Sequence, residues 1–261
     1  MKKRLTRISL IFFLVAAFPT GALAGGMFGP PQTLSAAAGG LNTAIGYLYH
    51  EDTYKNHPRH KMRHNIIYSQ AAWGKSGMWE IYGRLAASDM KMSDAFRSCL
   101  PSAVNIGSDF HDYWKFFGTL GAKGFYPVNR FFGGGIFMQA SYNPGKYTDE
   151  TPVLYNGSFF VADLEIKNLW DINLGAGLQA TLPGGIRAYA GPFVYLVRAD
   201  ARMSHNIPGL PFGTEKTFLK NKSPAGGYFG ADIPLIRGFR LNIEGQYTSR
   251  FSAGAAISYV Y

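Results

Sequence analysis

The chain has 261 residues, of which 47% are hydrophobic, 15% aromatic and only 16% charged. Soluble domains carry roughly 25% charged residues and disordered chains few aromatic ones, so this composition excludes an intrinsically disordered protein. The 32 glycines and 14 prolines are spread along the chain and interrupt any long helical repeat. A single all-β domain is therefore the first expectation, since β-barrels of about 200–250 residues commonly remain undivided.

The first 24 residues have the pattern of a cleaved secretory signal peptide. Met1–Arg4 is basic, Ile8–Phe18 is almost continuously apolar, and Ala22–Ala24 has the small-x-small pattern of a cleavage site. The apolar run is about 11 residues long, well short of the roughly 20 that a transmembrane helix requires. We expect cleavage after Ala24, which removes four basic residues and lowers the net charge from +10 to +6.

The remaining charge and the single cysteine limit the partners of the mature chain. A positive exported protein suits an anionic surface, whereas nucleic acid is not an expected partner. Cys99 is the only cysteine, so no internal disulfide forms, and it lies far from the cleavage point, so no lipoprotein anchor is expected. We expect a periplasmic N-terminal segment over residues 25–40 and a barrel domain over residues 41–261.

Strict alternation of apolar and polar residues is clearest near the C-terminus. From Phe239 to Tyr247 every odd position except Gly245 is apolar, and the even positions are Arg, Asn, Glu and Gln. Trp170–Leu182 and Phe251–Tyr261 alternate in the same way. Transmembrane β-strands have this pattern because one face meets lipid and the other the lumen. Soluble sandwiches also alternate, but here the polar faces carry many Gly, Ala and Ser residues, which suit a crowded narrow lumen.

Seven weaker alternating segments bring the number of expected strands to about ten. They are Leu41–Tyr49, Asn65–Trp73, Met78–Ala87, Tyr113–Ala122, Phe131–Tyr142, Ile186–Arg198 and Tyr228–Pro234. Short connections at 74–77, 126–130, 183–185 and 235–238 take turns with long ones at 50–64, 88–112, 143–159 and 199–225. This asymmetry predicts an antiparallel up-and-down barrel with periplasmic turns, outer loops and both termini in the periplasm.

The strand number depends on one ambiguous stretch. Phe160–Lys167 also alternates, and its parity runs on into Trp170. It either extends one strand far above the membrane, or ends in a turn at Lys167–Leu169 and adds a further hairpin. Ten strands are the first expectation, twelve the second, and eight would require two pairs to be loop hairpins.

The end of the chain resembles a known assembly signal. Tyr261, Tyr259 and Ile257, at every second position, resemble the C-terminal signal of bacterial outer-membrane β-barrel proteins that their insertion machinery reads. That signal usually has Gly five residues before the last, where this chain has Ala256. The resemblance implies an integral, porin-like barrel protein in the outer membrane of a Gram-negative cell envelope. It assigns no subfamily, because no enzyme or transporter signature accompanies it.

The strand positions that are expected to face the lumen include both acidic and basic residues. The expected lumen network consists of Glu80, Arg84, Asp171, Arg187, Asp232, Arg240 and Glu244. Unpaired charges in a closed lumen are costly, so we expect Arg and Lys to bridge Asp and Glu across it. A static network that braces the wall is favoured over a conducting filter, because a small barrel has little free bore.

Two clusters lie on the outer side. The first expected outer loop, His50–His64, holds four histidines and the basic residues Lys55, Arg59, Lys61 and Arg63. We favour a basic loop that contacts lipopolysaccharide phosphates over a metal site, because the histidine spacing matches no metal motif. The second cluster, Ser108–Asp112, groups hydroxyl, carboxylates and imidazole at the rim. Adjacent strand residues face opposite sides, so no catalytic residue is predicted there.

Three functions remain open from the sequence. The first is a non-enzymatic outer-membrane barrel, structural or surface-binding, with a largely filled lumen. The second is a narrow channel for small solutes, and the third is a hydrolase with its site at the outer rim. The expected partners are outer-membrane lipid, lipopolysaccharide and the barrel insertion machinery. No cofactor or metal is expected, and the sequence leaves the oligomeric state open.

Overall fold

The computed structural model describes residues 26–34, 40–54, 57–75, 77–96, 105–106, 109–155, 157–206 and 215–261. Within them nearly every element is a strand, and no helix is long and apolar enough to cross a membrane. The strands are β1 (Leu41–Tyr54), β2 (His57–Lys75), β3 (Trp79–Met92), β4 (Asn105–Ile106), β5 (Phe110–Pro127), β6 (Phe132–Asn143), β7 (Tyr147–Tyr155), β8 (Ser158–Thr181), β9 (Arg187–His205), β10 (Glu215–Lys220), β11 (Ala225–Pro234), β12 (Phe239–Tyr247) and β13 (Phe251–Val260), with a 3-10 turn at Pro183–Gly185.

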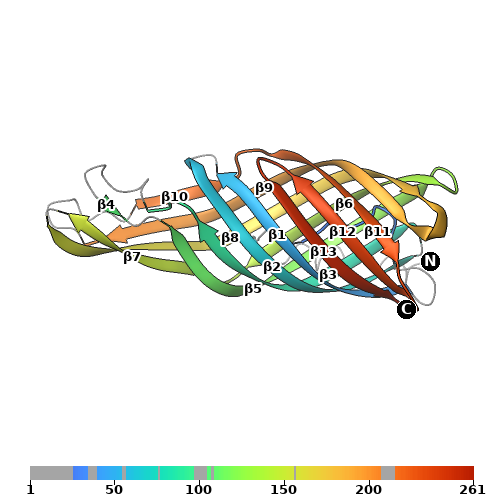
Figure 1. Ribbon diagram of the computed structural model, residues 1–261, viewed down its shortest axis with the longest axis horizontal. Helices are drawn as coiled ribbons and strands as arrows, with labels where there is room; N and C mark the ends of the chain where they lie inside the picture. Colours follow the sequence, from blue (N-terminus) through green and yellow to red (C-terminus); the bar gives the residue numbers. More distant parts are fainter. Residues whose placement is uncertain are drawn as a thin grey trace, which may run out of the picture.

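Ten of the described strands pair into a closed antiparallel ring. The ring runs β1-β2-β3-β5-β6-β8-β9-β11-β12-β13, and β13 pairs back onto β1 from Asn42↔Val260 to Tyr49↔Ala253. Figure 1 shows these strands tilted around one long axis. Each of the ten spans predicted from alternation corresponds to one strand of the ring. The predicted all-β barrel of about ten strands is confirmed.

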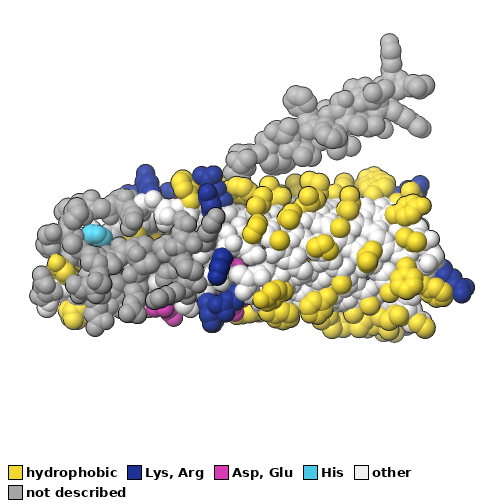
Figure 2. All heavy atoms as spheres, turned by 90° about the horizontal axis from the view of Figure 1, so that it is seen from above, with side chains coloured by type: hydrophobic (Ala, Val, Ile, Leu, Met, Phe, Trp, Pro, Cys, Tyr) yellow, Lys and Arg dark blue, Asp and Glu magenta, His cyan; other side chains and the backbone are white. Residues whose placement is uncertain are grey.

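The apolar positions of each strand face the outer surface of the ring. Large side chains such as Ile45, Leu85 and Leu178 are more than half exposed. Figure 2 shows these hydrophobic side chains spread over one long part of the barrel, with Lys and Arg gathered where that part ends. Aromatic rings lie near the ends of the strands. At the end with the short turns, for example, Trp73 packs against Trp79 with 5.2 Å between ring centroids. This surface is the apolar belt that a lipid bilayer requires.

The short connections and the C-terminus share one end of the barrel. The backbone N–H of Tyr261 donates to the carbonyl of Leu41 at 3.4 Å, so the last residue closes against the first strand. Tyr259 packs on Phe239 and Tyr261, with centroids 4.9 and 4.8 Å apart. Short turns mark the periplasmic end in barrels of this kind, so the opposite end is the outer one.

The outer connections are largely strands, which corrects the prediction of long loops. β1 and β2 stay paired up to Tyr54↔His57, so the segment expected as the loop His50–His64 is a β-hairpin. β7 pairs with the outer half of β8, and β10 pairs with the outer half of β9. Together they build a wall that continues the barrel beyond the apolar belt (Figure 1). The loops were expected because the alternation of apolar residues weakens there.

β8 runs without interruption from Ser158 to Thr181, so the stretch at Phe160–Lys167 extends one strand and the alternative turn does not form. Its register against β9 shifts between Lys167 and Trp170, and Asn168 has a positive φ of 52°. The shift exchanges the faces of the strand, although the apolar residues keep the same parity along the sequence. Even-numbered side chains are therefore buried in the outer half, while odd-numbered ones face the lumen in the membrane half.

The outer part of the barrel has a mainly apolar interior, which also holds a few buried polar side chains such as Asp52, His64 and Ser88. Buried side chains there include Tyr54, Met62, Met90, Met92, Phe96, Phe110, Val153, Leu164, Ile166, Leu169, Ala199, Ala201, Met203 and Leu219. The membrane part has the reverse arrangement, with apolar side chains outside and a polar lumen. The outer wall therefore has the burial pattern of a water-facing β-domain, continuous with a membrane barrel below it.

Candidate functional site in the lumen

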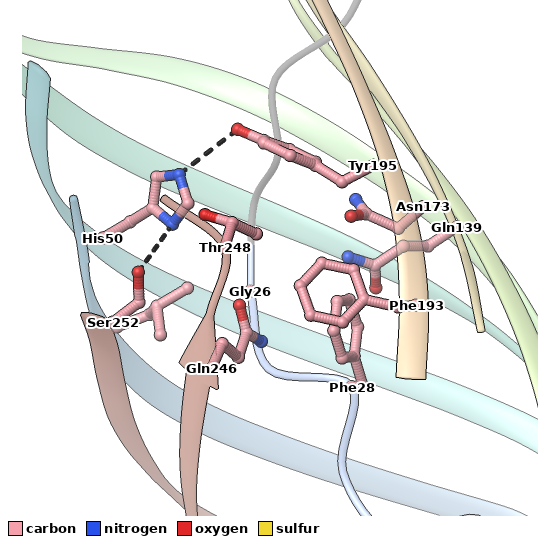
Figure 3. Close-up of a pocket in the computed structure, with 11 residues that line it drawn as sticks. Gly26, Phe28, His50, Gln139, Asn173, Phe193, Tyr195, Gln246, Thr248 and Ser252 are labelled. Atoms are coloured by element: carbon pink, nitrogen blue, oxygen red, sulfur yellow. Dashed lines mark hydrogen bonds between the residues drawn. The ribbon is translucent and has the colours of Figure 1, made fainter. Parts of the chain in front are cut away.

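Residues Gly26–Leu34, called the N-terminal segment below, lie inside the barrel. Met27 and Phe28 are each only 2% exposed, and Figure 3 shows Gly26 and Phe28 surrounded by side chains from the strands. We expected residues 25–40 to form a periplasmic segment ahead of the barrel, and the structure instead places 26–34 in the lumen. Residues 25 and 35–39 lie outside the described part of the chain.

Two charged side chains hold the outer half of the segment by its backbone. The N–H of Phe28 donates to Glu244 Oε1 at 2.8 Å, and the N–H of Gly29 donates to Glu244 Oε2 at 2.7 Å. The guanidinium of Arg84 donates from Nη2 to the carbonyl of Met27 at 2.5 Å. Hydrogen bonds to ionised groups are roughly twice as strong as neutral ones, so these contacts fix the segment firmly.

The inner half of the segment is held in the same manner. The N–H of Leu34 donates to Glu80 Oε2 at 3.1 Å. Gln32 and Gln179 exchange two hydrogen bonds, of 3.2 Å from the backbone N–H of Gln32 and 2.8 Å from Gln179 Nε2. These partners lie progressively nearer the periplasmic turns, so the segment runs along the barrel axis from Gly26 inward to Leu34.

An aromatic cluster surrounds Phe28. Its ring centroid lies 4.3 Å from that of Phe137, in a stacked arrangement, and 4.8 and 5.3 Å from those of Phe193 and Tyr228, which meet it edge-on. Gly177 makes room beside this cluster, since a Cβ there would come within 2.1 Å of the Tyr228 hydroxyl. Glycine on the lumenal face is therefore required by the segment and its neighbours.

All seven residues of the predicted lumen network face the interior. Asp232 forms the expected ion pairs, with Arg240 Nη2 at 2.6 Å and Arg187 Nη1 at 3.7 Å. Glu80, Arg84 and Glu244 bond the N-terminal segment as described above. Asp171 accepts from Asn173 Nδ2 at 2.5 Å. Three of the seven residues thus bind the N-terminal segment, whose place in the lumen the strand pattern did not reveal.

A cavity lies between the outer end of the segment and the wall. It is small and is lined by Gly26, Phe28, Leu48, His50, Gln139, Asn173, Phe193, Tyr195, Gln246, Thr248 and Ser252. In Figure 3 His50 lies between Tyr195 and Ser252. Its Nε2 is 3.2 Å from Tyr195 Oη and its Nδ1 is 3.0 Å from Ser252 Oγ.

His50 and His64 are interior residues, which corrects their prediction as part of a solvated loop. Their ring centroids are 6.4 Å apart, and His64 Nδ1 lies 2.7 Å from the carbonyl oxygen of Asp89. Burial lowers the pKa of each imidazole from 6.5 to about 4, so both are neutral at pH 7. The even parity of Leu48, His50 and Asp52 in the sequence could have revealed their inward orientation.

The remaining outer residues fall on the outside of the wall or beyond the described part. Lys61 and Arg63 lie on β2 facing outward, and Arg63 and Arg250 each approach Glu51 to 3.9 Å. The side chains of Lys55 and Arg59 lie outside the described residues. Within the described residues no group of three potential metal ligands is present.

The described residues of the rim cluster do not come together. Ser108 lies outside the described residues, His111 is exposed, and Asp112 is buried on the other face of β5, where it pairs with Lys115 at 3.2 Å. His111 and Asp112 therefore diverge, as strand geometry predicted.

A closed antiparallel ring with an apolar outer belt, aromatic rings at both ends of the belt and a polar interior defines a transmembrane β-barrel protein of the bacterial outer-membrane type. The ring must be closed, because a sheet with free edges would leave backbone N–H and C=O groups without hydrogen bonds in lipid.

No protein-family model matches the chain, and no curated protein matches it in sequence. Solved structures with a similar fold include the translocator domain of the autotransporter NalP from Neisseria meningitidis, at 12% identity and a TM-score of 0.49, covering 100% of this chain and 95% of that one. They also include the outer membrane protease OmpT from Escherichia coli, at 12% identity, 85% and 96% coverage and a TM-score of 0.45. The transport unit of the autotransporter AIDA-I from Escherichia coli is 10% identical, with 85% and 90% coverage and a TM-score of 0.43.

Proposed function

We propose that this protein is a non-enzymatic integral barrel of the outer membrane, whose lumen is filled by its own N-terminal segment and whose outer wall acts at the cell surface. The observation that carries the proposal is the double hydrogen bond from Phe28 and Gly29 to Glu244, which ties the segment to the wall at the middle of the lumen. A barrel of ten strands has a narrow bore even when empty, because bore grows with strand number.

The outer wall supplies a second obstruction to solute passage. Its interior is apolar and includes Met90, Phe96, Phe110 and Ile166, all essentially without solvent contact. An ion path would have to cross both this apolar layer and the polar layer occupied by the N-terminal segment. Both layers argue for a structural or surface-binding role and against a channel.

The outward basic side chains suit a contact with lipopolysaccharide. Lys61 and Arg63 lie on β2 just beyond Asn65, where the apolar belt ends, and Arg250 lies nearby through Glu51. Phosphate groups of the lipid occupy that level, and Arg pairs with them through charge-assisted hydrogen bonds. At the opposite end, the exposed Tyr261 is available to the barrel insertion machinery during assembly.

Planar-bilayer recording of the refolded mature protein tests the filled lumen. We expect no steady conductance from the parent, and more from a variant that lacks residues 26–34, with the synthetic peptide GMFGPPQTL lowering it again. If both proteins stay quiet, the outer apolar layer is the main obstruction. Steady ion-selective steps from the parent that change on Arg84→Ala or Glu244→Ala would replace this proposal with a channel.

One contact favours a hydrolase as the second candidate. Ser252 Oγ lies 3.0 Å from His50 Nδ1, beside a cavity, and burial keeps that imidazole neutral and able to accept a proton. However, Ser252 is only 2% exposed, and its Oγ also accepts the N–H of Glu51 at 3.2 Å. Labelling of Ser252 by a fluorophosphonate probe, lost in Ser252→Ala, would support the hydrolase; we expect no labelling.

A further inference from the structure

Four cationic residues from three separate parts of the chain meet around Thr53, near the outer end of β1. Lys61 is the direct partner of Thr53 across the β1–β2 ladder, and Arg63 follows on the same face of β2. The backbone N–H of Lys222 donates to the carbonyl oxygen of Thr53 at 2.9 Å, and Arg250 Nε donates to its Oγ1 at 3.4 Å. These four residues are called the cation cluster below.

In the described part of the chain, Glu51 is the carboxylate that forms ion pairs with the cation cluster. Arg63 Nε and Arg250 Nε each lie 3.9 Å from one of its oxygens, which is too far for a hydrogen bond. Within the described residues Lys61 and Lys222 form no ion pair. Like charges at neighbouring positions of a sheet repel each other. The cluster therefore has excess positive charge and N–H donors that suit an anion with several acceptor oxygens.

Exposed aromatic rings lie directly below the cation cluster, on the lipid side of the barrel. Phe251 follows Arg250 in the chain, begins β13 and is about half exposed. Tyr247 is its direct partner on β12, and the ring centroid of Phe229 on β11 lies 6.4 Å from that of Phe251. Figure 2 shows this boundary, where hydrophobic side chains give way to Lys and Arg. Cations and lipid-facing rings thus follow the order in which a lipid presents its headgroup and its acyl chains.

We propose that the cation cluster binds a phosphate group of one outer-leaflet lipopolysaccharide molecule, whose acyl chains lie along Tyr247 and Phe251. A phosphate monoester carries a charge of about −1.5 to −2 and three strong acceptor oxygens, so it can use several cations at once. Arginine binds phosphate through paired N–H donors, and lysine adds a point charge. The inference deepens the proposed surface contact and rests on it, and it adds Lys222 and Arg250 as direct ligands.

Binding to phosphorylated and dephosphorylated lipid A tests the site. The mature protein is purified in a non-ionic detergent, and its affinity for each lipid is measured by titration in mixed micelles. We expect the protein to bind bisphosphorylated lipid A at least ten-fold more tightly than the fully dephosphorylated form, because the charge-assisted contacts are lost with the phosphates. Equal affinities would overturn the proposal.

Two double variants locate the site. Lys222→Gln with Arg250→Gln should lower the affinity for bisphosphorylated lipid A at least five-fold and leave that for the dephosphorylated form unchanged. Lys216→Gln with Arg202→Gln is the matched control, since these two residues are direct partners on β10 and β9 and are exposed on the same outer wall. An equal loss in the control would show that only the overall positive charge matters, and the assignment to the surroundings of Thr53 would be wrong.

Glu51→Gln gives an expectation of the opposite sign, which a loss of folding cannot imitate. The change removes the negative charge that repels the phosphate and keeps an acceptor for the Tyr49 hydroxyl, which donates to Glu51 Oε2 at 3.0 Å. We expect at least two-fold tighter binding of bisphosphorylated lipid A, and unchanged or weaker binding would contradict the site. Inorganic phosphate in millimolar excess should not displace the lipid, because it has no acyl chains to contact the rings. Displacement would mean that the ligand is free phosphate and would overturn the assignment to a lipid.

Intact lipopolysaccharide separates this inference from the proposed surface contact. The comparison uses the double variant of Lys222 and Arg250 and a variant in which the four basic residues predicted for the first outer loop are replaced by Gln. If only the second variant loses binding, the surface contact stands and the site around Thr53 is wrong. If neither loses binding, both are wrong, and loss in both supports both.

Discussion

Glu244, on β12, accepts the backbone N–H of Phe28 at 2.8 Å, although the two residues are 216 positions apart in the chain. The contact joins the first described stretch of the protein to one of its last strands. Glu244 belongs to the alternating lumenal face of β12, whereas Phe28 belongs to a segment whose sequence has no strand pattern.

The first prediction concerns this contact. Glu244→Ala removes the acceptor for the backbone N–H groups of the buried Phe28 and the partly buried Gly29, and hydrogen bonds to a charged group contribute about 1.5–3 kcal/mol each. We expect the fraction of molecules with an undocked segment to rise at least ten-fold, measured as limited proteolysis between residues 26 and 34. Glu150→Ala, which alters an exposed carboxylate of β7, should not change it.

The second prediction tests the crowding of the lumen. In Gly177→Ala the new Cβ would lie 2.1 Å from the Tyr228 hydroxyl and 2.9 Å from Pro31, so the cluster around Phe28 must shift. Overpacking of this kind costs about 1–3 kcal/mol, which should appear as a lower urea midpoint of unfolding in lipid vesicles. Gly83→Ala is the control, because its Cβ meets only Leu120 at an ordinary 3.6 Å; equal midpoints would contradict the crowding argument.

The third prediction contrasts two carboxylates that each contact two cations. Asp232 is fully buried between Arg187 and Arg240, whereas Glu165 contacts Lys146 and Lys167 on the outer wall. Asp232→Ala should cost about 3–5 kcal/mol of unfolding free energy, because it strands two arginines in the lumen. Glu165→Ala should cost about 1 kcal/mol or less, as exposed ion pairs do. Urea unfolding of both variants measures the difference, and similar costs would refute it.

The fourth prediction is a loss of stability in acid. His50 and His64 have a pKa of about 4 in the folded protein against 6.5 ordinarily, because burial disfavours the imidazolium. Between pH 6.5 and about 4 the unfolded chain therefore takes up protons that the folded chain does not, and the unfolding free energy falls. Above pH 6.5 these groups contribute no pH dependence. The effect should be a few kcal/mol, since one pKa unit corresponds to about 1.4 kcal/mol.

Urea midpoints measured from pH 7.5 to 4 check this expectation. Asp52 opposes the effect at the acid end, because burial raises its pKa and the folded chain takes up that proton more readily. The double variant His50→Gln with His64→Gln should show a flatter profile over the same interval. A parent profile as flat as that of the double variant would show that the two imidazoles do not control acid stability.

The fifth prediction concerns the cell-surface contact. Replacing Lys55, Arg59, Lys61 and Arg63 together by Gln should weaken the association of the folded protein with lipopolysaccharide, and the difference should shrink as salt is added. Co-sedimentation with lipopolysaccharide over a salt titration measures it. Lys75→Gln, on the periplasmic end of β2, is the control. Unchanged binding of the quadruple variant at low salt would contradict the proposed surface contact.

The strands of the membrane region were predictable because side chains that face lipid must be apolar, and they alternate along each strand with side chains that face the lumen. β12 illustrates this, since Phe239, Leu241 and Ile243 must face lipid wherever Arg240 and Asn242 face the lumen. The outer wall follows a different rule. At Asn168 one residue in the left-handed region exchanges the faces of β8, and the continuous apolar parity of the sequence conceals that exchange.

The N-terminal segment could not be predicted from any pattern. Gly26–Leu34 pairs through backbone N–H and carbonyl groups with side chains from distant strands, and backbone groups are the same in every sequence. The lumenal charges were predicted by residue number, but their partner was not. Only a three-dimensional arrangement could show that Arg84 and Glu244 hold a third element between them.

The length of β8 determines how far the protein projects from the cell. Its 24 residues rise about 3.3 Å each, roughly 80 Å along the strand, whereas the apolar zone of such barrels is only about 25 Å tall. The turn between Tyr155 and Ser158 therefore stands well above the lipid headgroups, and a Cβ at Gly157 would meet nothing within 4 Å. A foreign epitope inserted at that turn would be presented to the surrounding medium, where antibodies, phages and neighbouring cells make first contact.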